Sequence, residues 1–160
     1  MTDMAASSPK HVFVIYMQST PDDVWRALTD PSMTKKYFHD TRVVSDFQVG
    51  SPIAYLLDEE AGPREAVRGT ILESDPPRLL KTSFYFAENS HGGTERSEET
   101  VVTYAVEPLG EVVKLTVTHE GFAGESEMFR STATGWPPIL SGLKTLLETG
   151  RPLNIPGMGG

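Results

Sequence analysis

Cysteine is absent from this 160-residue sequence, which excludes disulfide bridges and thiolate metal sites. Long apolar runs are missing too, and none of the existing ones is long enough to cross a bilayer as a helix. The first ten residues, MTDMAASSPK, lack the apolar centre of a secretory signal peptide. These absences predict a cytoplasmic protein without membrane insertion.

Basic residues are outnumbered by acidic ones: 14 Lys and Arg stand against 22 Asp and Glu, so the formal net charge is −8. Such a surface repels phosphate backbones, and we expect no nucleic-acid partner. The histidines at positions 11, 39, 91 and 119 have no close metal-ligand spacing. We therefore expect neither a metal site nor a cofactor.

The length is that of one domain, and a chain of this size can bury roughly 70% of its unfolded surface. Residues 1–10 are small and polar, which indicates a flexible N-terminus. Residues 11–150 carry the periodic patterns of a single domain. Residues 151–160 form a tail, and its end, Gly157 to Gly160, is no phosphate loop because no strand or helix brackets it.

The first structured elements are predicted to be a strand and two short helices. His11 to Gln18 is β-branched and aromatic, as in a strand. Thr20 is a good N-cap residue and Pro21 suits the first position of a helix. Asp30 and Pro31 repeat this signal, which predicts a second short helix through about Phe38.

The sequence from residue 43 to residue 119 alternates apolar and polar residues in short runs, as antiparallel strands do. The expected strands run through Val43–Phe47, Ile53–Leu57, Val67–Ile71, Leu80–Phe86, Val102–Val106 and Val113–His119. Turn-forming residues separate them, and no helical pattern falls between them. This order favours an α+β fold over a doubly wound one.

A long helix is predicted near the C-terminus, in TGWPPILSGLKTLLETG (Thr134 to Gly150). Its apolar residues recur in steps of three and four, so they form one stripe. We expect Pro137 and Pro138 in the first turn, where missing N–H groups cost nothing, and Trp136 at the entrance. The predicted architecture is a curved antiparallel sheet of about six to seven strands wrapped around this helix.

Several short motifs occur in an order typical of a known family. They are TPDDVWRALTDPSMTKKYF (Thr20–Phe38), VGSPI (Val49–Ile53), GTILESDPPRLLKTSF (Gly69–Phe84), VTYAVEP (Val102–Pro108), KLTVTHEGF (Lys114–Phe122) and GWPPILSGLKTLLETG (Gly135–Gly150). The chain resembles the activator-of-Hsp90-ATPase-homologue-like family of the Bet v 1-like, START-related superfamily. The resemblance implies a helix-grip fold around a cavity. It implies no fixed chemistry, because such folds serve lipid carriers, cyclases and chaperone partners alike.

The sequence departs from the family pattern at three places. Tyr37 stands where the family often has tryptophan, Gly50-Ser51 where it often has two glycines, and Ser83 where an aromatic residue is common. These changes alter the shape or register of the interior, so no relative's ligand can be transferred to this chain.

Several aromatic side chains occupy alternate strand positions and so face the same side of the sheet. They predict a cavity between sheet and helix. A dry, filled core is the alternative reading of the same residues. The residues expected to contact a ligand are Trp25, Phe38, Thr82, Phe84, Phe86, Tyr104, His119, Trp136, Leu140 and Leu143.

His119 is the most informative polar position because it shares parity with Leu115 and Val117 and should face the helix. It could bind a carbonyl or carboxylate, act as a base, or be a core histidine satisfied by a backbone carbonyl or a hydroxyl. Glu120 should face away, so the two form no dyad. Apolar surroundings should lower the pKa of His119 below 6.5.

The leading functional hypothesis is the binding of a small, largely apolar molecule, lipid-like or aromatic, in this cavity. An enzyme of cyclase or hydrolase type is an alternative, which is weaker because His119 has no evident acid–base partner. A stress-response regulator with a chaperone partner is suggested by the family resemblance alone. A second copy of the chain, forming a homodimer, is a further partner to test.

Overall fold

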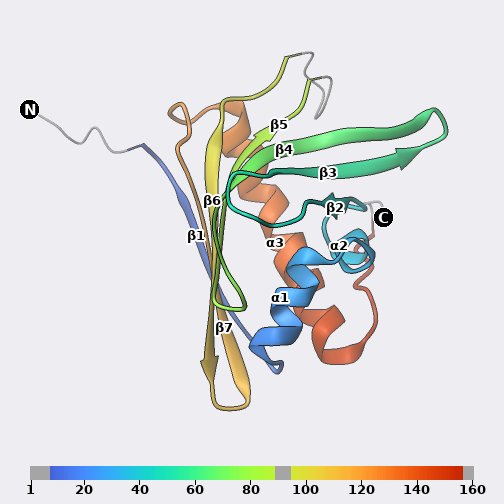
Figure 1. Cartoon of the computed structure of the whole chain (residues 1–160), viewed down its shortest axis with the longest axis vertical. Helices are drawn as coiled ribbons and strands as arrows, with labels where there is room; N and C mark the ends of the chain where they lie inside the picture. The colour runs from blue at the N-terminus through green and yellow to red at the C-terminus, as the bar shows by residue number, and fades with distance from the viewer. Residues whose placement is uncertain (1–7, 89–94, 157–160) are drawn as a thin grey trace, which may run out of the picture.

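In a computed structural model of the chain, residues 8–88 and 95–156 are described. Within these ranges the chain forms a seven-stranded antiparallel sheet and three helices (Figure 1). The helices are α1 (Pro21–Thr29), α2 (Pro31–Tyr37) and α3 (Glu127–Thr149). The strands are β1 (His11–Met17), β2 (Arg42–Val44), β3 (Pro52–Glu59), β4 (Gly62–Asp75), β5 (Leu79–Phe86), β6 (Thr100–Leu109) and β7 (Val112–Glu120).

Two sequence-based expectations concern positions outside the described residues. The start of the predicted flexible N-terminus, residues 1–7, and the end of the predicted tail, Gly157 to Gly160, are not described. His91 also lies outside the described ranges.

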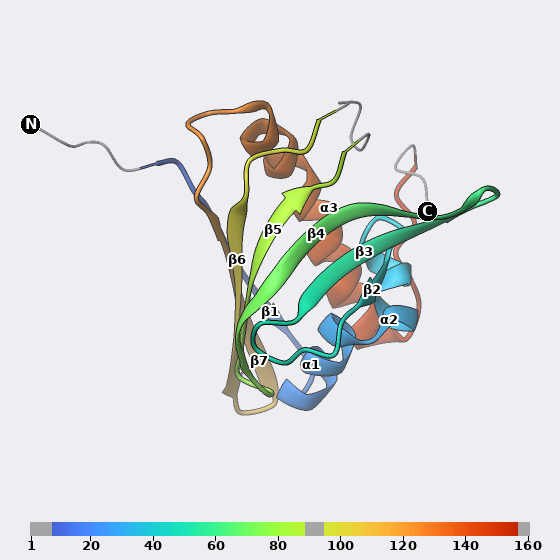
Figure 2. The same ribbon diagram turned by 45° about the horizontal axis from the view of Figure 1, so that its top comes forward.

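The sheet has the order β1-β7-β6-β5-β4-β3-β2 and bends around α3 (Figure 2). Strands β3 to β7 follow one another by hairpins, so each lies beside its neighbour in sequence. The α1–α2 segment carries the chain from β1 at one edge to β2 at the other. The predicted α+β helix-grip fold is therefore confirmed.

The predicted parity of the later strands is also confirmed. Alternate residues of β6 and β7 face the helix and are buried, while their neighbours face outward. The register places Tyr104 opposite Val117 and Val102 opposite His119. Because the side-chain period of a strand is two, this register fixes which residues enter the core.

Both short helices begin at the predicted caps. The Thr20 side chain accepts a hydrogen bond from the Asp23 N–H at 3.1 Å, and Asp30 accepts one from the Ser32 N–H at 2.8 Å. Each helix has proline in its first turn. The buried Tyr37 hydroxyl donates to the Ala27 carbonyl at 2.7 Å and so ties the two helices together.

The predicted start of the terminal helix is wrong by seven residues. Helix α3 begins at Glu127, with the Ser126 side chain accepting from the Phe129 N–H at 3.1 Å. Pro137 and Pro138 therefore lie inside the helix, and Trp136 lies near its middle instead of at its entrance. A proline in a helix interior costs about 3 kcal/mol. Burial of an apolar side chain returns roughly 1.5–3 kcal/mol, and α3 buries Trp136, Ile139, Leu140, Leu143 and Leu146.

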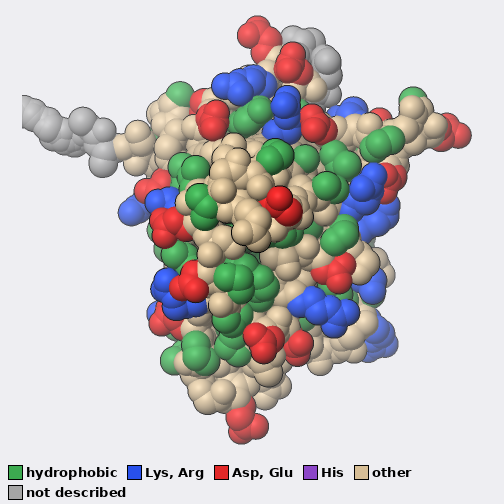
Figure 3. Space-filling view, in the orientation of Figure 1, with side chains coloured by type: hydrophobic (Ala, Val, Ile, Leu, Met, Phe, Trp, Pro, Cys, Tyr) green, Lys and Arg blue, Asp and Glu red, His purple; other side chains and the backbone are tan. Residues whose placement is uncertain are grey.

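The surface carries acidic and basic side chains interspersed over the face shown in Figure 3. Exposed apolar side chains gather on the outer side of β1, at Val12, Val14 and Tyr16. In the part of the chain that the structure describes, the helices lack the apolar length that a bilayer span would need.

Candidate ligand-binding pocket

A pocket of about 450 Å³ lies between the first half of α3 and the sheet. Its walls come from α3, from strands β3 to β5 and from the link between α2 and β2. The described residues that line it are Phe38, His39, Thr41, Leu57, Arg64, Ala66, Val67, Phe84, Phe86, Ser131, Thr132, Thr134, Gly135, Trp136 and Ile139. A cavity between sheet and helix is thus present as predicted, but along α3 it extends from Ser131 to Ile139.

The structure brings four of the ten expected ligand-contacting residues to the pocket wall, namely Phe38, Phe84, Phe86 and Trp136. Tyr104 and His119 are not among the lining residues but contact the Trp136 side chain. Thr82, Leu140 and Leu143 are buried in the core, and Trp25 is partly buried against it. The remaining six thus support the pocket wall or the core.

Trp136 is at the centre of an aromatic cluster and is only 2% exposed. Its ring centroid lies 5.8 Å from that of Phe38, 6.3 Å from Phe84 and 6.2 Å from Tyr104. Edge-to-face and tilted rings at such distances attract each other beyond simple burial. The wall that Trp136 gives to the pocket is therefore well fixed.

A chain of hydrogen bonds runs from Trp136 to the backbone of β5. The indole Nε1–H of Trp136 donates to His119 Nδ1 at 3.0 Å. Because the indole can only donate, His119 must carry its proton on Nε2, and this N–H donates to Thr100 Oγ1 at 2.7 Å. The Thr100 hydroxyl in turn donates to the Phe84 carbonyl at 2.6 Å.

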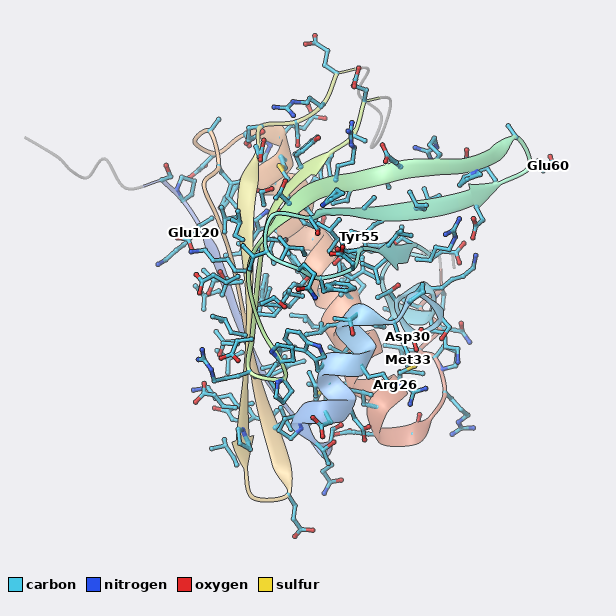
Figure 4. All side chains as sticks on the ribbon, in the orientation of Figure 1. Arg26, Asp30, Met33, Tyr55, Glu60 and Glu120 are labelled. Atoms are coloured by element: carbon cyan, nitrogen blue, oxygen red, sulfur yellow. The ribbon has the colours of Figure 1, made fainter. Side chains whose placement is uncertain are left out.

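This chain satisfies both nitrogens of His119, which is fully buried. Burial, together with a smaller effect of the nearby His11, lowers the pKa of His119 to about 3. The predicted lowering of this pKa is confirmed, and the arrangement is that of a core histidine bonded to a hydroxyl. Glu120 points away from the concave side of the sheet, as expected (Figure 4).

The buried tyrosines of the sheet interior are neutral at ordinary pH. Burial raises the pKa of the Tyr55 hydroxyl to about 12, and it raises the pKa of Tyr104 well above its usual value. Figure 4 shows Tyr55 in the space between the sheet and the helices.

The pocket mouth carries the polar residues. His39 has a left-handed backbone, with φ of 51°, and its Nε2–H donates to the Gly135 carbonyl of α3 at 3.1 Å. Arg64, on β4, donates a hydrogen bond from Nε to the carboxylate of Glu59 on β3 at 3.1 Å. Ser131 and Thr134 complete the α3 side of the mouth. The pocket is thus apolar at depth and polar at its opening.

Sequence reasoning missed most of the α3 side of this pocket because it started the helix too late. The spacing of Met128, Thr132, Trp136 and Ile139 in steps of four and three extends the inward-facing stripe back to Met128, two residues after Ser126. That signal, with Ser126 as a cap, could have placed Ser131 to Gly135 on the helix. His39 was not among the predicted ligand contacts, because no local sequence signal places it at a pocket.

The curved sheet, the long helix and the pocket between them define a helix-grip protein of the Bet v 1-like class. A family model for activator of Hsp90 ATPase homolog 1-like proteins matches residues 18–148. The chain belongs to this family, as its motifs predicted. A search of curated proteins gives no significant match.

Solved structures with this fold have low sequence identity to the chain. An Aha1 dimer from Colwellia psychrerythraea is 19% identical, with a TM-score of 0.66, and the match covers 89% of this chain and 98% of that one. An HSP90 activator from Plasmodium falciparum is 16% identical, with a TM-score of 0.67 and coverage of 86% and 95%. DynU16, from the dynemicin biosynthetic locus, is 18% identical, with a TM-score of 0.70 and coverage of 89% and 48%.

Proposed function

We propose that this protein binds a small, largely apolar molecule in the pocket between α3 and the sheet. The pocket volume of about 450 Å³ carries this proposal, because ligand sites typically enclose about 300–1,000 Å³ behind mostly apolar walls. Phe38, Phe84, Phe86 and Trp136 would supply most of the binding energy through burial, at about 25 cal/mol per Å².

Catalysis in the same pocket has little support from the geometry. The enzyme alternative depended on His119 as acid or base, and both of its ring nitrogens are bonded inside the protein. Its pKa of about 3 also makes it a poor base near neutral pH. Binding without reaction is therefore the function that this site supports best.

Native mass spectrometry of freshly purified protein tests the proposal by detecting a copurified small molecule. Titration with the fluorescent apolar probe N-phenyl-1-naphthylamine provides a second readout. Ile139→Trp should fill the pocket and abolish probe binding, whereas Ser141→Trp, an exposed position on the same helix, should leave it unchanged. Equal probe binding by the two variants, both with normal melting curves, would contradict the proposal.

A chaperone partner is a second candidate, and the likeness to the HSP90 activator from Plasmodium falciparum favours it. The exposed apolar residues Val12 and Val14 on β1 offer a surface for a protein partner. Stimulation of an Hsp90 ATPase by the purified protein, and its loss in Val14→Lys, would support this candidate. Light scattering on the same samples would show whether the chain forms a homodimer.

A further inference from the structure

The threonines of the pocket have already used their hydroxyl hydrogens inside the protein. Thr41 donates to the Phe38 carbonyl at 2.6 Å, Thr132 to Met128 at 2.8 Å and Thr134 to Ser131 at 3.0 Å. A hydroxyl has one hydrogen and two lone pairs. These three hydroxyls can therefore only accept a hydrogen bond from a ligand. The Thr132 hydroxyl already accepts one from His11 Nε2 at 3.1 Å.

His39 offers an acceptor for the same reason. Its Nε2 faces the Gly135 carbonyl at 3.1 Å, and a carbonyl oxygen can only accept, so Nε2 carries the proton. In the neutral ring the other nitrogen, Nδ1, then has a lone pair. His39 lines the pocket and is exposed at its mouth.

The two prolines of α3 release backbone acceptors in the same region. In a regular helix the N–H of each residue bonds to the carbonyl four residues before it. Pro138 has no N–H, so the Thr134 carbonyl loses this donor, and Pro137 does the same to the Ala133 carbonyl. Thr134 belongs to the pocket wall, whereas Ala133 is an exposed residue that does not line the pocket.

We propose that the pocket selects ligands whose polar end donates a hydrogen bond, such as a phenol or alcohol on an apolar body. This inference rests on the proposed binding function and specifies its ligand class. The Thr134 carbonyl at the mouth receives the ligand hydroxyl, and the aromatic wall holds the apolar body. A ligand with only acceptors cannot bond to the Thr134 carbonyl or to His39 Nδ1, and so it gains no hydrogen bond from them.

Arg64 makes an anionic ligand the main competing class. Its guanidinium already donates to Glu59 from Nε at 3.1 Å and from an NH₂ group at 3.0 Å. The carboxylate of Glu59 neutralises the charge that would attract an anion. We therefore expect a carboxylate ligand to bind more weakly than a matched phenol.

Three probes that share one apolar body test this selectivity. Calorimetric titration at pH 7.5 compares 4-phenylphenol, 4-methoxybiphenyl and biphenyl-4-carboxylate. The phenol should bind about five- to tenfold more tightly than the ether, the ratio expected for one hydrogen bond. Binding of the ether or the carboxylate as tight as that of the phenol would overturn the inference while leaving the proposed binding function intact. Binding by none of the three would overturn both.

A pair of proline variants tests the assignment to the Thr134 carbonyl. Pro138→Ala supplies an N–H to this carbonyl, so the preference for the phenol over the ether should fall at least twofold. Pro137→Ala makes the same chemical change but acts on Ala133, so the wild-type ratio should remain. Both variants replace a proline by a strong helix former and should fold. An unchanged ratio in Pro138→Ala, or an equal loss in both variants, would overturn the assignment.

Discussion

The hydrogen bonds of His119 to Trp136 and Thr100 favour its neutral ring. The Trp136 indole donates to the unprotonated Nδ1, so a proton added to that nitrogen would face the indole N–H. Charging the ring would also place a cation in the fully buried interior, and this burial, with a smaller effect of His11, lowers the pKa to about 3.

Stability should therefore depend on pH through His119. The folded-state pKa lies below the unfolded value of about 6.5, so the unfolded chain binds the proton more readily. The contribution is fully present above pH 6.5 and is lost as the pH falls toward 3. We expect roughly 3–6 kcal/mol over this window, measured by urea unfolding at several pH values. In His119→Gln this part of the pH dependence should vanish. A His119 ring signal that titrates near pH 6.5 in NMR would contradict the assignment.

Thr100→Val should cost about 1–3 kcal/mol, because it removes the hydroxyl that accepts from the buried Nε2–H of His119 and donates to the Phe84 carbonyl. Thr103→Val on the same strand is the matched control, since Thr103 lies on the opposite face and should change stability by less than about 0.5 kcal/mol. Urea unfolding of both variants provides the comparison. Equal effects would mean that the hydrogen-bond chain contributes nothing specific.

Helix α3 holds two prolines in its interior because its packing outweighs their cost. Its middle and end bury a continuous apolar stripe against the sheet, and the αL residue Gly150 ends it with a bond from its N–H to the Leu146 carbonyl at 2.8 Å. The capping serine at its start accepts from the backbone of the first turn.

Leu143→Ala should lower the free energy of unfolding by about 2–5 kcal/mol, because Leu143 is only 1% exposed and the change leaves a cavity. Leu147→Ala, one turn later on the same helix, removes a half-buried side chain and should cost clearly less. Thermal and urea unfolding of the two variants measure this difference. A cost for Leu143→Ala below that for Leu147→Ala would refute the packing described for α3.

The whole molecule depends on α3 because the sheet has one long helix to cover its concave face. Truncation before Ser126 should expose the buried rows of β5, β6 and β7 and leave an aggregating or molten chain. Truncation after Arg151 removes only exposed residues of the described part and should keep the wild-type melting temperature. Calorimetric melting and dye binding measure both. A cooperative melting transition in the chain truncated before Ser126 would show that the sheet is stable without α3.

The sequence by itself determined the local elements and the direction of their side chains. Thr20-Pro21 and Asp30-Pro31 specify helix starts through bonds made within three residues, and alternation along β5 to β7 specifies which side chains face the core. The order of these elements then left one long helix to cover one curved sheet. These signals are short-range, so they can be read without the fold.

Only the tertiary structure decided which inward-facing residues line an open pocket and which fill the core. Phe84 and Tyr104 both face the concave side of the sheet. Phe84 lines the pocket, whereas Tyr104 contacts the Trp136 ring and does not line the pocket. The bonds that occupy His119 join residues from β6, β7 and α3, and His39 meets Gly135 across 96 positions of sequence. Parity fixes a direction along one strand, but a void and a long-range hydrogen bond depend on how distant elements approach each other.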